Sequence, residues 1–478
     1  MPQLIKISVA ILLMILAPSV VKAQKKPSQT NDTINAIFTL AQNGNAAAQN
    51  EVGLWYYTGR NRPRDFKEAL KWWLKSAVQG NAQGLEYAGT CYQYGRGVTA
   101  DSLKAIQLYQ TSIQRGNKSL VLHSMEQAKK GNLFSNMLLA SCYQNGIGVD
   151  RDSIKAIPFL NIAAAGLSVE AQRELAMTYL KTRQPDKAAV WFRQGAENGN
   201  SDCAYYYGIM LLNGTGVTRN RDLGADYILQ AAYKGLPEAM YQAGTCYMTG
   251  DGLSRSPEQA VKWYLKAAVK KLPKAQWILA NCYRQGIGTP VNYQQALTWY
   301  TQATGNGYAK PFKQLLDSIT HSPFATYLNG IQAYKQKDFT KALNDFKTVE
   351  KAGIIDGQIM TGLILTNPDY PRHDLKKGVH LIEQAAHTNA HAMYLMATFC
   401  ENGRGTEKSM SRAIEYLEHS AKMGYAPAEC ALGDMYFEGR GVEHNPRKAM
   451  EWYAKAATHG QLTDNAKRRY AHFLKEKK

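Results

Sequence analysis

Apolar and polar positions follow a helical period along most of the chain. Ala239, Ala243 and Tyr247 succeed one another at intervals of four residues, which places them on one face of a helix. After a loop, a second helical segment follows; its copy near the C-terminus carries Trp452 and Tyr453 on the apolar side. The pattern predicts pairs of amphipathic helices that bury one face each.

These helix pairs recur at a fixed step of 36 residues. The stretch from Gly235 reads GLPEAMYQAGTCYMTGDGLSRSPEQAVKWYLKAAVKK, and the stretch from Gly424 reads GYAPAECALGDMYFEGRGVEHNPRKAMEWYAKAATHG. One pair alone cannot bury its apolar faces, so the units must stack. The boundary residues at this step are Gly44, Gly80 and Gly116; Gly199, Gly235, Lys271 and Gly307; and Gly424 and Gly460.

A Gly-x-Gly loop separates the two helices of most units. Glycine adopts the left-handed conformation that ends a helix sharply, so we interpret these loops as turns. A phosphate cradle would need a strand before the loop and a helix N-terminus after it, and these loops follow helices. The loops are Gly95/Gly97, Gly146/Gly148, Gly214/Gly216, Gly250/Gly252, Gly286/Gly288, Gly403/Gly405 and Gly439/Gly441.

The combined pattern resembles the Sel-like repeat family, a branch of the tetratricopeptide-like solenoids. It reads Leu/Ala-Gly-x-x-Tyr, Gly-x-Gly-Val, Lys-Ala-x-x-Trp-Tyr-x-x-Ala-Ala and a closing Gly, and it extends over roughly Gly44–Gly460. The resemblance implies an all-α, right-handed α/α superhelical solenoid of about eleven helix-pair repeats. The expected units start near Gly44, Gly80, Gly131, Gly166, Gly199, Gly235, Lys271, Ser322, Gly353, Asn389 and Gly424.

The pattern is interrupted at a few places. Gly116–Gly131 is only one helix long, which predicts an extra half-unit. Short turns replace the glycine loop at Thr182–Asp186 and Tyr334–Asp338. The pattern lapses after Gly307, where we expect a break near 308–322. The predicted organisation is therefore a signal peptide (1–23), a linker and N-terminal capping helix (24–43), a first array (44–307), an irregular junction (308–322), a second array (323–460), and a C-terminal capping helix with a basic tail (461–478).

The N-terminal residues have the features of a secretory signal. Lys6 supplies the positive charge, Ile7–Leu16 the apolar region, and Val21–Ala23 the small-residue cleavage site. The alternative is an uncleaved anchor, but the apolar run is shorter than the roughly 20 residues that a membrane span requires. We therefore expect cleavage after Ala23, a periplasmic or secreted protein, and no transmembrane segment once the signal is removed.

The length and charge narrow the function further. A chain of 478 residues is too long for one compact core, so an extended array is expected. The chain has 57 Lys and Arg against 38 Asp and Glu, and loss of the signal lowers the net charge of +19 by only two. Either these cations form a solvated surface, or they face acidic proteins or anionic polymers. Nucleic acid is excluded as an expected partner because the protein is exported. The basic groups are Arg60, Arg62 and Arg64; Lys129 and Lys130; Lys270 and Lys271; Lys376 and Lys377; Lys467, Arg468 and Arg469; and Lys475, Lys477 and Lys478.

The seven cysteines are interpreted as small core residues. Four of them occupy one repeat position, and packed helices lie about 10 Å apart, beyond the reach of a disulfide between adjacent copies. No zinc-type spacing is present. The cysteine-rich relatives of this family carry two cysteines in each unit; that pairing is absent here, so their β-lactam binding is not expected. The shared position holds Cys91, Cys142, Cys246 and Cys282, and the others are Cys203, Cys400 and Cys430.

The remaining candidate chemistry is weak. His380, Glu383 and His387 lie on one helix face and could hold a transition metal, but a solvated face is the commoner reading. No nucleophile elbow, phosphate-binding loop or HExxH arrangement is found in a supporting context. The aromatic pairs could stack on sugars or bases, but their repeated position favours packing. They are Trp72-Trp73, Trp263-Tyr264, Trp299-Tyr300 and Trp452-Tyr453. We expect no catalytic, cofactor-binding or metal-binding residues and no cofactor.

The expected function is a non-enzymatic, exported scaffold or adaptor that binds a protein partner on the concave surface of the solenoid. The family resemblance implies the same role. The alternative is a protein that binds an anionic polysaccharide or peptidoglycan of the cell envelope through its basic surface. Binding that collapses with moderate salt would distinguish that alternative from a peptide groove.

Overall fold

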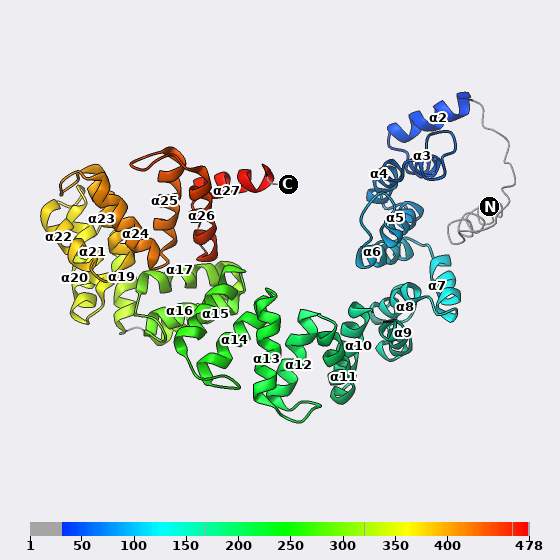
Figure 1. The fold of residues 1–478 in the computed structure, drawn as a ribbon, viewed down its shortest axis with the longest axis horizontal. Helices are drawn as coiled ribbons and strands as arrows, with labels where there is room; N and C mark the ends of the chain where they lie inside the picture. Colours follow the sequence, from blue (N-terminus) through cyan, green and yellow to red (C-terminus); the bar gives the residue numbers. More distant parts are fainter. Residues whose placement is uncertain (1–30, 167, 320, 461, 477–478) are drawn as a thin grey trace. The chain divides into compact units, whose positions relative to one another are not determined.

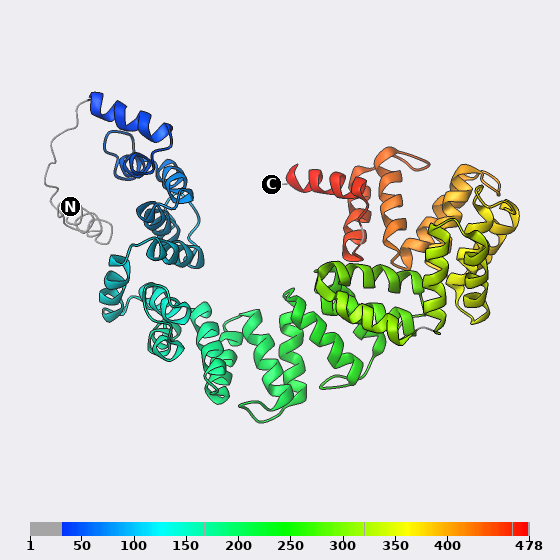
Figure 2. The same ribbon diagram turned by 180° about the vertical axis from the view of Figure 1, so that it is seen from behind.

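The computed structural model describes residues 31–476 except 167, 320 and 461. This part of the chain contains 26 α-helices, one π-helical turn and no strand. It divides after Thr178 into two compact units (Figures 1 and 2). The predicted signal peptide and polar linker lie outside the described residues.

The first unit holds the N-terminal helices. They are α2 (Asn31–Gln42), α3 (Ala46–Thr58), α4 (Phe66–Val78), α5 (Ala82–Tyr94), α6 (Ser102–Gln114), α7 (Ser119–Lys129), α8 (Leu133–Asn145) and α9 (Ser153–Ala165), followed by most of α10 (Val169–Lys181).

The second unit holds the remaining helices. They are α11 (Pro185–Glu197), α12 (Ser201–Asn213), α13 (Arg221–Tyr233), α14 (Pro237–Thr249), α15 (Pro257–Val269), α16 (Pro273–Gln285), α17 (Tyr293–Ala303), the π-helical turn η1 (Thr304–Tyr308), α18 (Ala309–Ser318), α19 (Pro323–Lys335), α20 (Phe339–Lys351), α21 (Ile355–Thr366), α22 (Leu375–Ala385), α23 (Ala390–Asn402), α24 (Met410–Lys422), α25 (Ala426–Glu438), α26 (Pro446–Thr458) and α27 (Asp464–Glu476).

Within each compact unit, consecutive helices pack in pairs and the pairs stack on one another, which confirms the predicted all-α repeat solenoid. In the first unit α3 packs on α4, α5 on α6, and α8 on α9. In the second unit the pairs are α12/α13, α14/α15, α16/α17, α19/α20, α21/α22, α23/α24 and α25/α26. Stacking contacts such as α4 on α5 and α13 on α14 join one pair to the next.

The ends of the helices follow from short polar caps and glycines. Asn81 accepts from the backbone N–H groups of Gln83 and Gly84 at the start of α5, and Asp101 accepts from the N–H of Lys104 at the start of α6. Gly95 ends α5 in the left-handed conformation, with φ of 65°. The Gly-x-Gly loops are therefore turns, as predicted.

The buried interior consists of small residues and aromatic rings. All seven cysteines are buried, as predicted for core residues. Trp73 and Trp299 are fully buried and Trp263 is nearly so, which confirms the packing role of the second-helix aromatics. Small residues at the facing positions let the helices approach closely.

Two of the predicted departures are visible directly. α7 is a single helix between the pairs α5/α6 and α8/α9, as expected for a half-unit. The short turns after α10 and α19 contain Arg183 and Lys337 with positive φ of 58° and 61°.

The segment 308–322 differs from the irregular junction that we expected. It contains the ten-residue helix α18, and the interruption lies just before it, where Gly307 has φ of 104° in the π-helical turn. The helices on either side of this segment still meet. The ring of Phe324 on α19 lies 5.1 Å from that of Tyr293 on α17, and the Tyr327 hydroxyl donates to Gln294 Oε1 at 2.8 Å.

Candidate binding pocket at the half-unit

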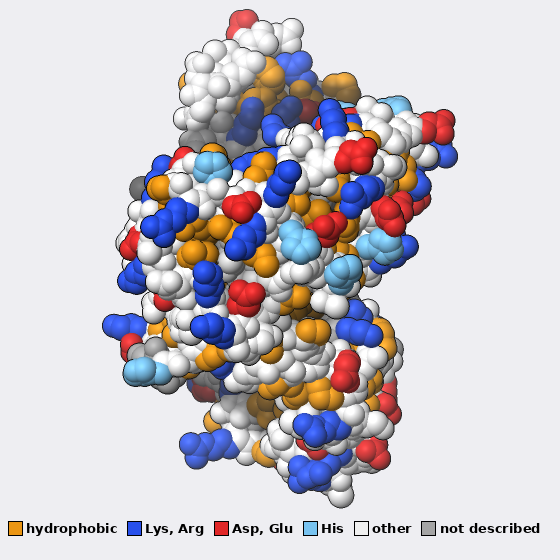
Figure 3. Space-filling model, turned by 90° about the vertical axis from the view of Figure 1, so that its left-hand side faces the viewer, with side chains coloured by type: hydrophobic (Ala, Val, Ile, Leu, Met, Phe, Trp, Pro, Cys, Tyr) orange, Lys and Arg blue, Asp and Glu red, His pale blue; other side chains and the backbone are white. Residues whose placement is uncertain are grey.

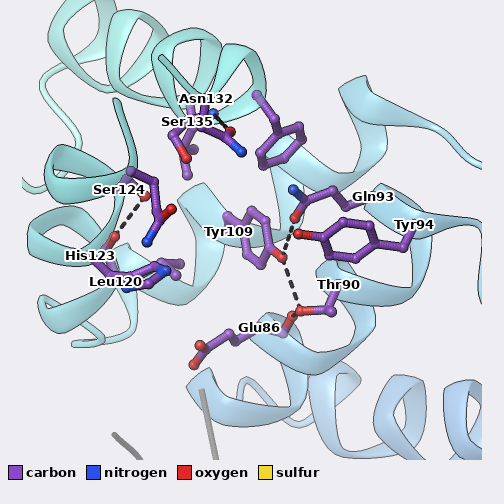
Figure 4. A pocket seen from close by; sticks show the side chains of 13 residues that line it. Glu86, Thr90, Gln93, Tyr94, Tyr109, Leu120, His123, Ser124, Asn132 and Ser135 are labelled. Carbon is purple, nitrogen blue, oxygen red and sulfur yellow. Dashed lines mark hydrogen bonds between the residues drawn. The ribbon is translucent and has the colours of Figure 1, made fainter. Parts of the chain in front are cut away.

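A pocket opens in the first unit where the half-unit interrupts the regular stack. It lies between α5, α6, α7 and α8 and is open to solvent (Figure 4). It exists because α7 has no partner helix, so α6 is followed by one helix instead of a pair. The lining residues are Glu86, Thr90, Gln93, Tyr94, Tyr109, Leu120, His123, Ser124, Gln127, Asn132, Phe134, Ser135 and Leu138.

A hydroxyl network forms one wall of the pocket (Figure 4). The hydroxyl of Tyr109 donates to Gln93 Oε1 at 2.9 Å and lies 3.0 Å from Thr90 Oγ1. Thr90 in turn donates to the backbone carbonyl of Glu86, one turn earlier on α5. Burial raises the pKa of Tyr109, so this phenol stays protonated at neutral pH. The wall is therefore neutral and rigidly held.

Glu86 is the one acidic residue in the lining. Asn117, in the link between α6 and α7, donates to its Oε2 at 2.7 Å. Burial raises the pKa of Glu86, and the Asn117 hydrogen bond opposes that rise. Within the described part of the chain, no lysine, arginine or histidine forms an ion pair with this carboxylate. The pocket therefore holds a buried carboxyl group that no cation of the described residues pairs with.

His123 faces the same space from α7. Its Nε2 atom is buried and, among the described residues, has no hydrogen-bond partner. Burial is the largest cause that lowers the pKa of this imidazole, so the ring is neutral at neutral pH. Because buried polar atoms are normally paired, this nitrogen is hydrogen-bonding capacity that internal packing leaves unused.

The pocket can bind a polar group, and its residues form no constellation for covalent chemistry. It has a carboxylate, a neutral imidazole and hydroxyls, but we find no nucleophile held by a base. The sequence predicted the half-unit but missed the pocket. The available signal was the pair of ionisable residues near that interruption: His123 lies within the half-unit itself, and Glu86 lies in the helix pair before it.

Several exposed arginines of the basic excess also have a structural role. In four loops, the arginine just before a second helix donates to a carbonyl near the end of the first helix, where carbonyls lack a helical partner. Arg404, in a glycine loop, donates to the Thr366 carbonyl of the preceding helix-pair repeat. The four bonds are Arg64 to Thr58, Arg151 to Gln144, Arg219 to Leu212 and Arg255 to Met248.

Other members of the basic groups are also engaged. Arg469 bridges Asp434 and Glu438, and Lys467 pairs with Asp464. Lys129 lies in the last turn of α7, where a cation interacts favourably with the helix dipole. The face in Figure 3 shows basic and acidic side chains interspersed. Neither basic nor acidic side chains form a continuous patch on that face.

The predicted histidine face on α22 is not assembled as a metal site. His380 contacts Gln384 at 3.1 Å, and Glu383 pairs with Arg412 at 3.2 Å. His387 is exposed. Among the residues that the structure describes, no group of three or more His, Cys, Asp and Glu side chains could hold a metal ion. The described helices likewise include none that is long and apolar enough to cross a membrane.

Comparison with known proteins gives partial similarities. A stretch of 128 residues is 28% identical to chitin synthase regulatory factor 3 of Schizosaccharomyces pombe and covers 25% of this chain but 14% of that protein. The crystal structure of c5321, a protective antigen of uropathogenic Escherichia coli with an SLR fold, is 21% identical, with a TM-score of 0.39, over 93% of this chain and 86% of that one. A Sel1 repeat protein from Oxalobacter formigenes is 27% identical, with a TM-score of 0.40, over 43% and 86%.

A family model describes most of the repeats. The Sel1 repeat model matches residues 46–81, 82–117, 134–166, 169–200, 201–236, 237–268, 273–308, 390–425 and 426–461. The gap between the second and third matches contains α7, so the half-unit stands outside the family pattern. Because the matched segments cover more than half of the sequence, the chain belongs to the Sel1 repeat family.

Proposed function

We propose that this protein is an exported, non-enzymatic scaffold that binds a protein partner on the concave side of its repeats. Sel1 repeat proteins generally act as protein-interaction scaffolds, and their fold is typically non-catalytic. Stacked helix pairs suit this role because the buried positions hold the array together while the exposed positions remain free for recognition.

The pocket at the half-unit is the observation that supports the binding of a partner. In the interior of the regular pairs the repeat residues pack on one another, as when Trp73 donates to the Asn50 carbonyl inside the stack. At α7 the regular packing stops, and Glu86 and His123 keep unused binding capacity. A partner segment seated across α5 and α7 would use that capacity.

Photocrosslinking in cells tests the proposal. A photoreactive amino acid replaces Gln127 at the pocket or Lys347 on α20 as a control, and the crosslinked products are identified by mass spectrometry. We expect one recurrent protein from position 127 and not from 347, and that protein, once purified, should bind the full chain saturably. Equal labelling from both positions, or no saturable binding, would contradict the scaffold.

The location is a separate part of the proposal. The signal features of residues 1–23 support export and cleavage after Ala23. The intact mass of the protein from its native host tests it: export predicts a mature chain that begins at Gln24 and is recovered in the periplasmic or culture fraction. A cytoplasmic protein that retains Met1 would refute this part alone.

An anionic envelope polymer is the weaker candidate. It requires a continuous basic surface, whereas the loop arginines donate to helix-end carbonyls and Arg469 is paired with two carboxylates. No observation on the described residues favours this candidate over a protein partner.

A further inference from the structure

The side chains that line the α5–α8 pocket favour one class of ligand. Thirteen residues line it, and Glu86 is the only acidic one among them. Its carboxylate accepts one hydrogen bond, from the neutral amide of Asn117. A half-buried carboxylate without a counter-ion is costly, and a cation that enters the pocket would remove that cost.

The rest of the lining suits the stem of a long side chain. Phe134 lies against Tyr109 edge to face, with ring centroids 5.7 Å apart, and Leu120 and Leu138 add apolar surface. Lysine and arginine combine an apolar stem with a charged head, and aromatic rings attract such heads.

The charged side chains just outside the pocket do not make it favourable for an anionic ligand. Glu126 on α7 and Lys130 just after it both act on His123, with opposite effects on its pKa. The guanidinium carbon of Arg96 lies 5.4 Å from the centroid of the Tyr94 ring. The rim of the pocket therefore already holds one cation on an aromatic face. An anionic ligand would meet the Glu86 carboxylate inside the pocket, which disfavours it.

We propose that the α5–α8 pocket binds the cationic side chain of a lysine or arginine presented by the partner, with Glu86 as its counter-ion. This rests on the proposed function, because the partner supplies the side chain. The aliphatic stem lies between Phe134 and Leu120, and the charged head reaches the Glu86 carboxylate. The hydroxyl wall formed by Thr90 and Tyr109 supplies further oxygen atoms near the head group.

The test uses small probes on the purified full chain. Methyl NMR of Leu120 and Leu138 follows titration with N-acetylarginine amide and N-acetyllysine amide, and with neutral N-acetylcitrulline amide as the matched control. We expect saturable shifts with the two cationic probes and at least about tenfold weaker binding of citrulline, because a charge-assisted hydrogen bond is about twice as strong as a neutral one.

Variants locate the counter-ion. Glu86→Gln should weaken the cationic probes by about tenfold or more, and Glu126→Gln, an exposed carboxylate on α7, should leave them within about twofold. Equal binding of citrulline, no effect of Glu86→Gln, or no methyl shift with any probe would overturn the proposal. The citrulline comparison needs only the natural chain, so it stands even if Glu86→Gln misfolds.

The two proposals fail in different ways. If the cationic probes bind but crosslinking from position 127 finds no partner, the pocket chemistry stands and the scaffold fails. If a partner is captured and purified but binds the chain and its Glu86→Gln variant equally, the scaffold stands and the cation site fails.

Discussion

The buried carboxylate of Asp356 accepts a hydrogen bond from the backbone N–H of Tyr293 at 2.9 Å, across 63 residues. Asp356 is 2% exposed and lies on α21, and it also accepts from the N–H of Gln294. The carboxylate thus caps the N-terminus of α17, which belongs to a different repeat. The pair α19/α20 separates the two helices in sequence. In a simple stack each repeat contacts only its neighbours, so this bond links repeats that stacking alone would leave apart.

Asp356 should make the second unit less stable as the pH rises. Burial raises its pKa to about 6 from an ordinary 3.8, so the folded carboxyl holds its proton more tightly than the unfolded one. The stabilisation is complete below about pH 3.8 and is lost as the pH rises through 6, which amounts to about 3 kcal/mol. In Asp356→Asn this pH dependence should disappear, because the amide keeps an acceptor without a charge.

Hydrogen exchange of the Tyr293 amide and thermal unfolding between pH 4 and 8 measure this effect. Asp369→Asn, at an exposed aspartate paired with Lys337, is the control and should keep the pH dependence of the natural chain. An unchanged slope in Asp356→Asn would show that the buried carboxyl does not titrate in this range.

His391 should make the second unit less stable as the pH falls, the opposite of the effect of Asp356. Burial lowers its pKa to about 4, and its ring packs on Tyr425 with centroids 5.7 Å apart. The neutral ring's contribution is present above about pH 6.5 and is lost as the pH falls through 4, which is up to about 3 kcal/mol. His391→Gln should therefore lose less stability than the natural chain between pH 7.5 and 4.5.

Thermal unfolding at those two pH values checks the His391 prediction. His380→Gln, at an exposed histidine on α22, provides the comparison. The prediction is wrong if both variants lose as much stability on acidification as the natural protein.

Alanine substitutions at Gly252 and Gly235 distinguish the cost of a left-handed backbone from the cost of a steric clash. Both have positive φ, 75° and 95°. A Cβ on Gly252 would clash with the backbone carbonyl of Arg221 in the preceding unit, whereas one on Gly235 would meet nothing within 4 Å. Each alanine costs about 1–2 kcal/mol for the left-handed backbone. Gly252→Ala should cost at least about 2 kcal/mol more, because backbone atoms must move.

Urea unfolding of the two glycine variants, followed by circular dichroism, measures the difference. Equal midpoints would mean that the loop and α13 move apart without cost. The close approach of the loop to the preceding repeat would then contribute nothing to stacking.

Arg219 should stabilise the end of α12 by its bond to the Leu212 carbonyl, which is 2.7 Å long. Arg219→Met keeps the apolar stem and removes the donor, so it should cost about 1–2 kcal/mol. Arg193→Met removes an exposed pair with Glu197 at 3.8 Å and should change stability by less than about 0.5 kcal/mol. Hydrogen exchange in the last turn of α12 and the unfolding midpoint compare the two. A larger effect at Arg193 would contradict the capping role.

The regular parts of the fold were predictable because local chemistry specifies them. The glycines that end the first helices, such as Gly95, and the Asn and Asp caps, such as Asn81, mark helix ends within a few residues. The cysteines were placed in the core by their repeated position, and Cys91 is fully buried. The junction at 308–322 was less predictable, since α18 forms a helix where the repeat pattern is absent.

The pocket could not be predicted because it depends on how an unpaired helix lies against its neighbours. The sequence showed that 116–131 is one helix long. It did not show that α7 would leave Glu86 and His123 facing a shared space, since these residues lie on helices from different units. The role of the arginines was hidden for a similar reason, because a charge count does not tell whether Arg219 reaches a carbonyl or solvent.

The sequence by itself determined the repeating unit, its helices and turns, and the buried face of each helix, because these follow from the spacing of residues within one unit. Tertiary structure alone decided which units meet beyond their neighbours, as Asp356 and Tyr293 do, and where the stack leaves a pocket beside Glu86. The physical reason is that small rotations between successive helix pairs accumulate along a solenoid. Contacts across several units depend on that accumulated geometry, which no local pattern records.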